Sequence, residues 1–531
     1  MKLTVSALGL CVTTALLAGC GGNDAPASSS GGGDLVDGAT FTMAVSSDPG
    51  NLDPQMAAGS VLFTVTQLAY DPLFSVNPET GDIESALATE WDATGTTVNL
   101  TLADAITCAD GTELTASDVA DNLNFVADPA SKSPFLGTFL PVGAKATADD
   151  AARTVTIKLT SPAPFVLNGL ASLPMVCPGG MTDRASLARA TNGTGPYELT
   201  EAAPGDHYTY EIRDGYTWGP DGATTDTKGL PATVVIKVVE NETTAANLLL
   251  SGDLNAAAIL GPDATRLEKA GLFVAETPAL VGEQWYNHAE GRATSDPQVR
   301  MALTQALDLE KIQSVLTSGK GGPATALAVN QPSSCPGDSV SGSLPAHDPD
   351  AAAALLDEAG WTLGSDGVRA KDGARLDLTF LYQNNTGSAG AAAAELAVQD
   401  WKDIGVKATA KSQNEGTLTQ TIFGAGDWDV TWISLNVSSP DQAVPFLSGP
   451  AAPDGTNFAA IQNADYDALV KKAMAMPGVE GCTTWLEAES GLIANADIVP
   501  FANSTVQTFG AKAEFQTPGQ LIPTSIRMMA K

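Results

Sequence analysis

The stretch of sequence that decides the fold reads Asp110-Gly111-Thr112-Glu113-Leu114-Thr115-Ala116-Ser117-Asp118-Val119. Its first two residues favour a tight turn after a strand, because glycine adopts positive φ at little cost. Thr115 and Asp118 have the spacing of a capping box, which satisfies free backbone N–H groups at a helix start. The helix that they begin has an apolar face starting at Val119. A strand, a turn and a capped amphipathic helix in succession indicate an α/β protein.

Strand-like and helical segments alternate along the rest of the chain, without a strict βαβ rhythm. Runs of β-branched residues predict strands at Thr40–Val45, Thr96–Leu102, Thr154–Leu159, Tyr208–Arg213 and Thr233–Val239. Asp296-Pro297 predicts the start of a helix, and Gly360 the end of another over Ala351–Ala359. A chain of 531 residues is too long for one compact core. We therefore expect an α/β fold with two or three domains.

Further short motifs follow one another in a recognisable order. They read Asn51-Leu52-Asp53-Pro54, Tyr70-Asp71-Pro72-Leu73-Phe74, Leu87-Ala88-Thr89-Glu90-Trp91, Gly193-Thr194-Gly195-Pro196-Tyr197, Leu249-Leu250-Ser251-Gly252-Asp253, Asp296-Pro297-Gln298-Val299-Arg300 and Leu355-Leu356-Asp357-Glu358-Ala359-Gly360-Trp361. With the opening stretch, they resemble the peptide/nickel-type family, family 5, of bacterial ABC-transporter solute-binding proteins. This family includes the dipeptide- and oligopeptide-binding proteins. Each motif alone is weak, but the shared order covers the chain from about residue 40 to its end.

The resemblance implies a two-lobed periplasmic-binding-protein-like α/β fold (type II, cluster C) with a hinge. It maps the first lobe to residues 39–66, 194–291 and 499–531, an extra domain inserted in that lobe to 67–193, and the second lobe to 292–498. It also implies a monomeric binding protein that captures a peptide or similar polar solute and delivers it to ABC permease subunits with their ATPase. Neither enzymatic activity, nor a cofactor, nor a resident metal is expected. Arg300 is interpreted as a structural ion-pair former.

Five residues are expected at the cleft from their position in the family pattern. Trp285, Tyr286 and Asn287 lie where the chain first crosses between lobes, and relatives place aromatic residues there against the ligand. Trp428 and Trp432 fall in the second-lobe segment that closes over the cleft. Aromatic faces stack on peptide bonds, sugar rings or cations. Core packing is an equal alternative for these side chains.

The same second-lobe segment departs from the family at an important position. Peptide-binding relatives have an aspartate there that pairs with the α-ammonium group of the ligand, whereas this chain has Ser438, near Asn436. A hydroxyl offers no opposite charge to a desolvated cation. Asp441 is the nearby substitute. Oligosaccharides, blocked peptides and other polar solutes stay open, as do a metal chelate or haem with His288 as ligand, and a structural lipoprotein that binds nothing.

The N-terminus predicts export and lipid anchoring. Lys2 precedes the apolar run Leu3–Leu17, which is shorter than the roughly 20 residues of a membrane span but suits a signal peptide. Leu17-Ala18-Gly19-Cys20 resembles a bacterial lipobox, so we expect removal of residues 1–19 and lipidation of Cys20. Residues 20–38 then form a flexible Gly/Ser tether on the outer face of the cell membrane. An ordinary cleaved signal peptide is the alternative.

Four further cysteines lie in the body of the chain: Cys108, Cys177, Cys335 and Cys482. An even number in an exported protein predicts two disulfides, for which three pairings exist. The domains implied by the resemblance favour Cys108–Cys177 and Cys335–Cys482, because each pair then falls within one domain. The cysteines are far apart and lack a C-x-x-C pair, so a zinc site is not expected.

Composition excludes other classes of function. The formal net charge of −34 argues against nucleic acid as a partner and against electrostatic attraction to anionic lipids. The chain has no G-x-S-x-G, H-E-x-x-H or Walker A motif, and its three histidines, at positions 207, 288 and 347, are widely separated. A secreted hydrolase is therefore the least favoured alternative.

Overall fold

The computed structural model describes residues 34–57 and 59–530. The predicted signal peptide, the lipobox with Cys20 and most of the predicted tether lie outside these residues. Among the helices of the described part, none is long and apolar enough to cross a membrane.

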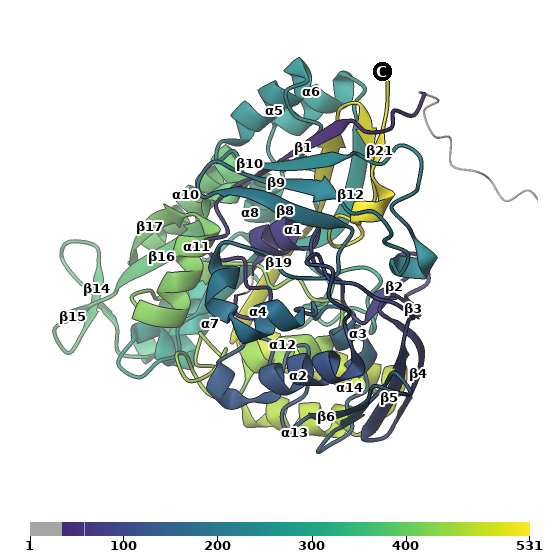
Figure 1. Cartoon of the computed structure of the whole chain (residues 1–531). Coiled ribbons are helices and arrows are strands. Elements are labelled where there is room, and N and C mark those ends of the chain that lie inside the picture. The colour runs from purple at the N-terminus through teal and green to yellow at the C-terminus, as the bar shows by residue number, and fades with distance from the viewer. Residues whose placement is uncertain (1–33, 58, 531) are drawn as a thin grey trace, which may run out of the picture.

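One ten-stranded mixed sheet runs through the whole molecule (Figure 1). Its strands, in spatial order, are β17 (Lys407–Gln413), β16 (Asp377–Gln383), β18 (Val430–Trp432), β12 (Phe273–Tyr286), β19 (Ile498–Gly510), β11 (Ala256–Ile259), β1 (Thr40–Val45), β10 (Thr233–Val238), β9 (His207–Ile212) and β8 (Tyr197–Ala203). The half from β11 to β8 is called the first lobe below, and the half from β17 to β18 the second lobe.

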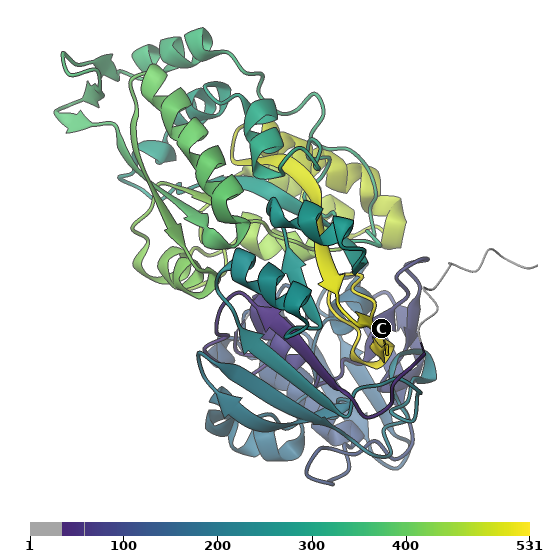
Figure 2. The same cartoon turned by 90° about the horizontal axis from the view of Figure 1, so that it is seen from above.

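Strands β12 and β19 connect the two lobes. They pair antiparallel over almost their full length, from Phe273 opposite Gly510 to Trp285 opposite Ile498. The end of β12 also pairs with β18 in the second lobe, and the end of β19 pairs with β11 in the first. Figure 2 shows the yellow strand β19 passing from the green half of the molecule to the blue half. The chain therefore crosses between lobes within two paired strands.

The first lobe carries an antiparallel four-stranded sheet beside the main one. It contains β4 (Ala88–Thr94), β5 (Thr97–Leu102), β7 (Thr154–Lys158) and β6 (Lys145–Asp149), in that spatial order. Helix α2 (Ala116–Ala127) packs on this sheet and buries Val119, Leu123 and Val126. All these elements lie within residues 67–193. The predicted bounds of this domain and of the two lobes stay a prediction, because β12 and β19 belong to both halves of the main sheet.

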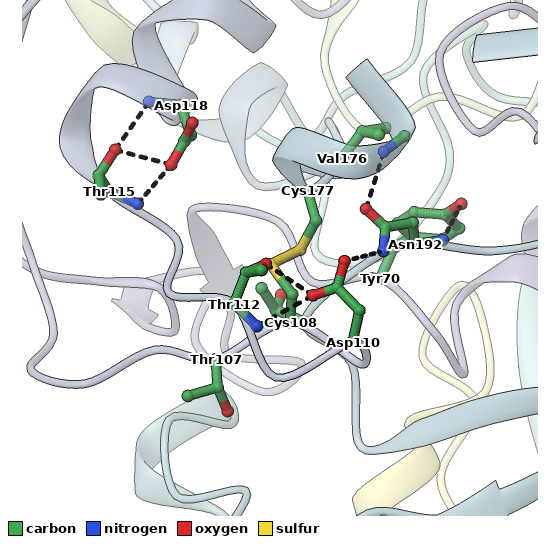
Figure 3. Close-up of a disulfide and its surroundings, with 12 residues drawn as sticks. Tyr70, Thr107, Cys108, Asp110, Thr112, Thr115, Asp118, Val176, Cys177 and Asn192 are labelled. Carbon is green, nitrogen blue, oxygen red and sulfur yellow. Dashed lines mark hydrogen bonds between the residues drawn. A yellow bond between two sulfur atoms is a disulfide. The ribbon is translucent and has the colours of Figure 1, made fainter. Parts of the chain in front are cut away.

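The opening stretch of the sequence folds as its residues indicate (Figure 3). Thr115 and Asp118 form both hydrogen bonds of a capping box at the start of α2. Asp110 accepts hydrogen bonds from the backbone and hydroxyl of Thr112 and from the side chain of Asn192. The turn next to it is held by the disulfide Cys108–Cys177. A second disulfide joins Cys335 to Cys482 in the second lobe, so the structure contains the favoured pairing.

Further helices and short strands complete both lobes. The first lobe has α1 (Ser60–Thr66), α3 (Val166–Leu170), α4 (Pro178–Thr182), α5 (Glu242–Ser251), α6 (Asp263–Lys269) and the pairs β2 (Phe74–Val76) with β3 (Ile83–Ser85) and β20 (Ala513–Glu514) with β21 (Arg527–Met528). The second lobe has α7 (Pro297–Gln305), α8 (Leu309–Leu316), α9 (Pro349–Glu358), α10 (Gly387–Asp403), α11 (Glu415–Gln420), α12 (Pro440–Leu447), α13 (Ala464–Met474), α14 (Cys482–Ala494) and the small sheet β13 (Thr362–Leu363), β14 (Arg369–Lys371) and β15 (Ala374–Arg375).

Arg300 on α7 is a structural residue, as the sequence indicated. Its guanidinium pairs with Asp497 at 2.8 Å, and both side chains are buried. It also donates to the backbone carbonyls of Thr294, Ser295 and Ala496. Because these hydrogen bonds satisfy the buried cation, the pair fixes α7 against the segment that leads into β19.

Candidate functional site

A cavity of about 2550 Å³ lies between the two lobes. The first lobe contributes one face of α1, residues 134–142, and the segments around residues 239–243 and 257–263. The second lobe contributes residues 383–388, one face of α11 and the loop and helix from residue 433 to 446. The walls of the cavity thus come from both lobes, and neither lobe forms the cavity alone.

Aromatic rings form the first-lobe wall. Phe135 and Phe139 stack with ring centroids 4.7 Å apart, and Phe63 of α1 lies 6.0 Å from Phe135. Val142, at the edge of this wall, is 63% exposed although its side chain is apolar. Apolar and aromatic side chains that line a cavity are typical of a binding surface. Phe63, Phe135, Phe139 and Val142 are called the aromatic wall below.

The second-lobe wall is a loop that is tied to the connecting strands. The Asn436 side-chain amide accepts a hydrogen bond from the N–H of Leu280 and donates one to the carbonyl of the same residue in β12. The backbone of Ser438 donates to the Gln442 side chain and accepts from Ser334. Asp441, in the first turn of α12, accepts a hydrogen bond from the Ser439 hydroxyl at 2.5 Å. Burial raises the pKa of Asp441 to about 6.

Of the residues expected at the cleft, Asn436, Ser438 and Asp441 line the cavity. Trp285, Tyr286, Asn287 and Trp428 do not, and Trp432 borders only a small neighbouring recess of about 20 Å³. Their burial favours core packing, the alternative that the sequence left open for these five residues.

The physical reason is that the end of β12 is covered on both of its faces. Trp285 is fully buried, donates to the carbonyl of Ile433 and packs against Phe458 at 4.7 Å. Tyr286 bonds to Gln284 and Thr304. The other three residues are buried as well. Asn287 donates to the carbonyl of Trp428, and Trp432 donates to the Gln284 side chain.

An aromatic residue that the sequence analysis missed stands in front of this core. Phe423 lines the cavity and packs edge-on against Phe458 at 5.2 Å. Phe458 in turn contacts Trp285 and Trp428. Trp285 and Trp428 thus lie two layers behind the cavity surface. The aromatic wall was missed too, since Phe63 lies in a short helix and the other three residues lie in an irregular segment, and neither carries a family motif.

Carboxyl groups dominate the charges around the cavity. Its lining includes the ten acidic residues Asp71, Glu79, Glu84, Asp221, Glu240, Glu242, Asp263, Glu415, Asp441 and Asp454, against the two basic residues Lys132 and Arg527. A cleft lined by one sign of charge concentrates counter-ions of the other sign. The cavity therefore disfavours anionic solutes.

Metal binding has little support within the described residues. No group of three or more histidine, cysteine, aspartate or glutamate side chains there is placed to hold a metal ion. His288 is not part of the cavity lining, and its ring lies 3.3 Å from the carbonyl of Asp497. Burial lowers the pKa of His288 to about 3, so its imidazole is neutral.

Two α/β lobes, joined by a pair of strands around a large cavity, define a hinged solute-binding protein. The chain matches the model of the bacterial extracellular solute-binding proteins, family 5 (middle), over residues 82–456. It belongs to this family, which consists of binding proteins and not of enzymes.

Two curated relatives are similar over much of the chain. Protein XP55 from Streptomyces lividans is 28% identical over 370 residues, which cover 65% of this chain and 61% of XP55. The match thus spans less than two thirds of the length of XP55. The glutathione-binding protein GsiB from Escherichia coli strain K12 is 27% identical over 395 residues, which cover 72% of this chain and 71% of GsiB.

Solved structures are similar over nearly the whole chain. A substrate-binding protein from Microbacterium hydrocarbonoxydans, complexed with 4-hydroxybenzoate hydrazide, has a TM-score of 0.79 and 26% identity, and covers 92% of this chain and 100% of its own. The oligopeptide-binding protein AppA from Bacillus subtilis, in complex with a nonapeptide, has a TM-score of 0.78 and 19% identity, and covers 94% and 100%. The fold is therefore the cluster C periplasmic-binding-protein fold.

Proposed function

We propose that this protein is the extracytoplasmic solute-binding component of an ABC importer, held on the outer face of the membrane by a lipid on Cys20. It captures a peptide or similar polar solute in the cavity between its lobes and delivers it to the permease subunits and their ATPase. It acts as a monomer without a cofactor.

The observation that carries the proposal is the position of the cavity. Both lobes line it, and only the paired strands β12 and β19 run through both halves of the sheet. The register of these strands shifts between Leu280 and Gly282 and again between Gly282 and Glu283. Irregular pairing locally weakens a ladder, so a hinge is favoured at this point. Asn436 links the cavity wall to Leu280 beside these shifts. A solute that contacts this wall therefore acts close to the hinge.

The size and lining of the cavity support a peptide-sized solute. Pockets for single small molecules have volumes of roughly 300–1,000 Å³, and this cavity measures about 2550 Å³. The aromatic wall suits apolar side chains, while the loop around Ser438 offers polar groups. Relatives bind a nonapeptide, glutathione or an aromatic hydrazide. These ligands share amide-like polar groups, and they differ widely in size.

Asp441 is the proposed partner for a positive charge on the solute. It is the carboxylate of the second-lobe loop that lines the cavity, and Ser438 stands where peptide-binding relatives have aspartate. Burial holds the pKa of Asp441 near 6, so its carboxylate is ionised at neutral pH. A desolvated ammonium group requires such an opposite charge.

The other solute classes receive less support. A metal chelate or haem bound through His288 is disfavoured, because that ring is not part of the cavity lining. An oligosaccharide remains the second candidate, since aromatic faces such as those of Phe63 and Phe139 stack on sugar rings as well as on apolar side chains.

The first experiment identifies the solute directly. The protein is purified without added ligand, examined by native mass spectrometry and then denatured, and released small molecules are sequenced or fragmented. A released peptide supports the proposal, and a released oligosaccharide replaces it with the second candidate. Protein that carries no solute and binds none from peptide and oligosaccharide libraries would contradict a binding function.

A second experiment tests Asp441 with defined probes. Trilysine and N-acetyl-trialanine amide are titrated by calorimetry against wild type, Asp441→Asn and the control Asp350→Asn, which changes an exposed carboxylate on α9. We expect Asp441→Asn to weaken trilysine binding about tenfold or more and to leave the neutral probe unchanged, as expected for a buried charge pair. If Asp441→Asn and wild type bind trilysine with equal affinity, the proposed role of Asp441 as a partner for positive charge is wrong.

A further inference from the structure

Two hydrogen bonds join the lobes directly at the edge of the cavity. The backbone N–H of Ser60 donates to Oε1 of Glu415 at 2.8 Å, and the Ser60 hydroxyl donates to Oε2 at 2.9 Å. Ser60 is the first residue of α1 in the first lobe, and Glu415 is the first residue of α11 in the second. Because both carboxylate oxygens accept, this contact fixes the relative orientation of the two helices.

A glycine makes the close approach of the two helices feasible. Gly59 has φ of +149°, which side-chain-bearing residues rarely adopt. A Cβ atom at this position would lie 2.6 Å from Oε1 of Glu415. The backbone before α1 is therefore shaped to admit the carboxylate of the opposite lobe.

The same two helices direct phenylalanines into the cavity. Phe63 follows Ser60 by one helical turn, and Phe423 lies two turns beyond Glu415, in the wide turn Thr421–Ala425. Both rings belong to the cavity lining. The hydrogen-bonded pair therefore lies on the same helix faces as two of the rings that line the cavity.

The lobes also touch at another edge through apolar groups. Phe165 of the first lobe packs in one cluster with Cys335 and Trp485 of the second. A Cβ atom at Gly137 would lie 3.4 Å from the ring of Pro445 across the cavity. Such apolar contacts are nondirectional. The pair Ser60–Glu415 adds a contact with defined geometry.

We propose that Ser60 and Glu415 form an interlobe clasp, which is made when the lobes close and which slows their reopening. The clasp sets the proportion of closed protein, and through it the affinity for solute. This inference rests on the proposed function, because it presumes that the lobes open and close about β12 and β19.

The test measures closure without requiring the solute. Spin labels are attached to Glu211→Cys in the first lobe and Glu358→Cys in the second, two exposed positions, and the distribution of distances between them is recorded by double electron–electron resonance. In the full chain, we expect Glu415→Ala to lower the ratio of closed to open protein about tenfold, and Ser60→Ala, which removes one of the two hydrogen bonds, to lower it by less. Gly59→Ala should act like Glu415→Ala. The control Glu395→Gln changes an exposed glutamate of α10 and should leave the ratio unchanged.

The outcomes separate the clasp from the proposed function. If wild type shows two distances and Glu415→Ala shows them in the same proportion, the clasp is wrong while the hinge stands. If wild type shows one distance that no variant or peptide library alters, hinge closure fails, and with it both proposals. Thermal unfolding of each variant, with melting temperatures close to that of wild type, shows that a changed ratio reflects closure and not loss of folding.

Discussion

Glu283 should make the protein less stable as the pH rises from about 5 to 8. This residue lies in β12 beside the register shifts and is 1% exposed. Its Oε2 accepts one hydrogen bond, from the N–H of Leu435 at 2.7 Å, while Oε1 has no partner among the described residues. Burial raises the pKa of Glu283 from the ordinary 4.5 to about 8, against the opposing effect of the Leu435 hydrogen bond.

The sign of the effect follows from proton linkage. In the folded protein Glu283 keeps its proton up to a pH of about 8, whereas in the unfolded chain it loses the proton near 4.5. Between these values the folded state binds more protons, so the free energy of unfolding falls as the pH rises. The full difference in pKa corresponds to roughly 4–5 kcal/mol. Glu489, also buried, has a raised pKa and acts in the same direction.

The assay is urea unfolding at pH 5 and pH 8 for wild type and Glu283→Gln. Glutamine resembles the protonated side chain, so the variant should lose less stability between the two pH values than wild type. The expected difference is roughly 3–4 kcal/mol, because part of the full pKa difference lies outside this pH range. Titrating groups that do not interact with Glu283 contribute equally to both proteins and cancel in the difference. Glu395→Gln, an exposed control, should behave like wild type. An identical pH dependence in wild type and Glu283→Gln would refute the assignment of a buried, protonated carboxyl at the hinge.

Three further predictions concern the anchor, a disulfide and the core. Cys20→Ala should release the protein from the membrane or leave an uncleaved precursor, as fractionation and mass spectrometry would show; a processed variant that stays on the membrane contradicts lipidation. Replacing both Cys108 and Cys177 with alanine opens a loop of 69 residues and should lower the free energy of unfolding by about 4 kcal/mol; an unchanged urea midpoint would contradict this. Trp285→Ala should cost about 3–5 kcal/mol of stability without the solute, and solute affinity lost at unchanged stability would return this residue to the binding site.

Local signals in the sequence predicted the frame of the protein well. The capping box of Thr115 and Asp118 starts α2 at Ala116, and Asp296-Pro297 starts α7 at Pro297. These signals are reliable because each satisfies backbone groups within a few residues of itself. The predicted helix over residues 351–359 is α9 at Pro349–Glu358, shifted by only two residues at its start. Strand positions were equally close, as with Thr40–Val45 for β1.

The cavity wall could not be predicted in the same way. Whether Trp285 faces a cleft or a core depends on what covers β12, and the covering residues, such as Phe458 and Ile433, are distant in sequence. Phe63, Phe139 and Phe423 reach the cavity through the relative position of the lobes. No periodicity in the sequence encodes that position. Asn436, Ser438 and Asp441 do line the cavity, and they share one segment with a known place in the family pattern. Their contact with a solute stays a prediction.

The motifs themselves explain why the family is easier to recognise than the solute. Asp71 of the Tyr70–Phe74 motif accepts hydrogen bonds from Thr194, Tyr216 and Trp218. A Cβ atom at Gly193 would lie 2.3 Å from a backbone oxygen of the neighbouring segment, so only glycine allows the two motifs to pack.

Motif residues such as Asp71 and Gly193 are constrained by backbone geometry and by buried polar groups. These constraints hold whatever solute the protein binds. Phe63, Phe423 and Asp441 also line the cavity, and they lie outside these motifs. They can change with the solute while the frame stays the same. The solute must therefore be inferred from the chemistry of the cavity wall, where aromatic rings and carboxylates together favour a cationic or neutral solute over an anionic one.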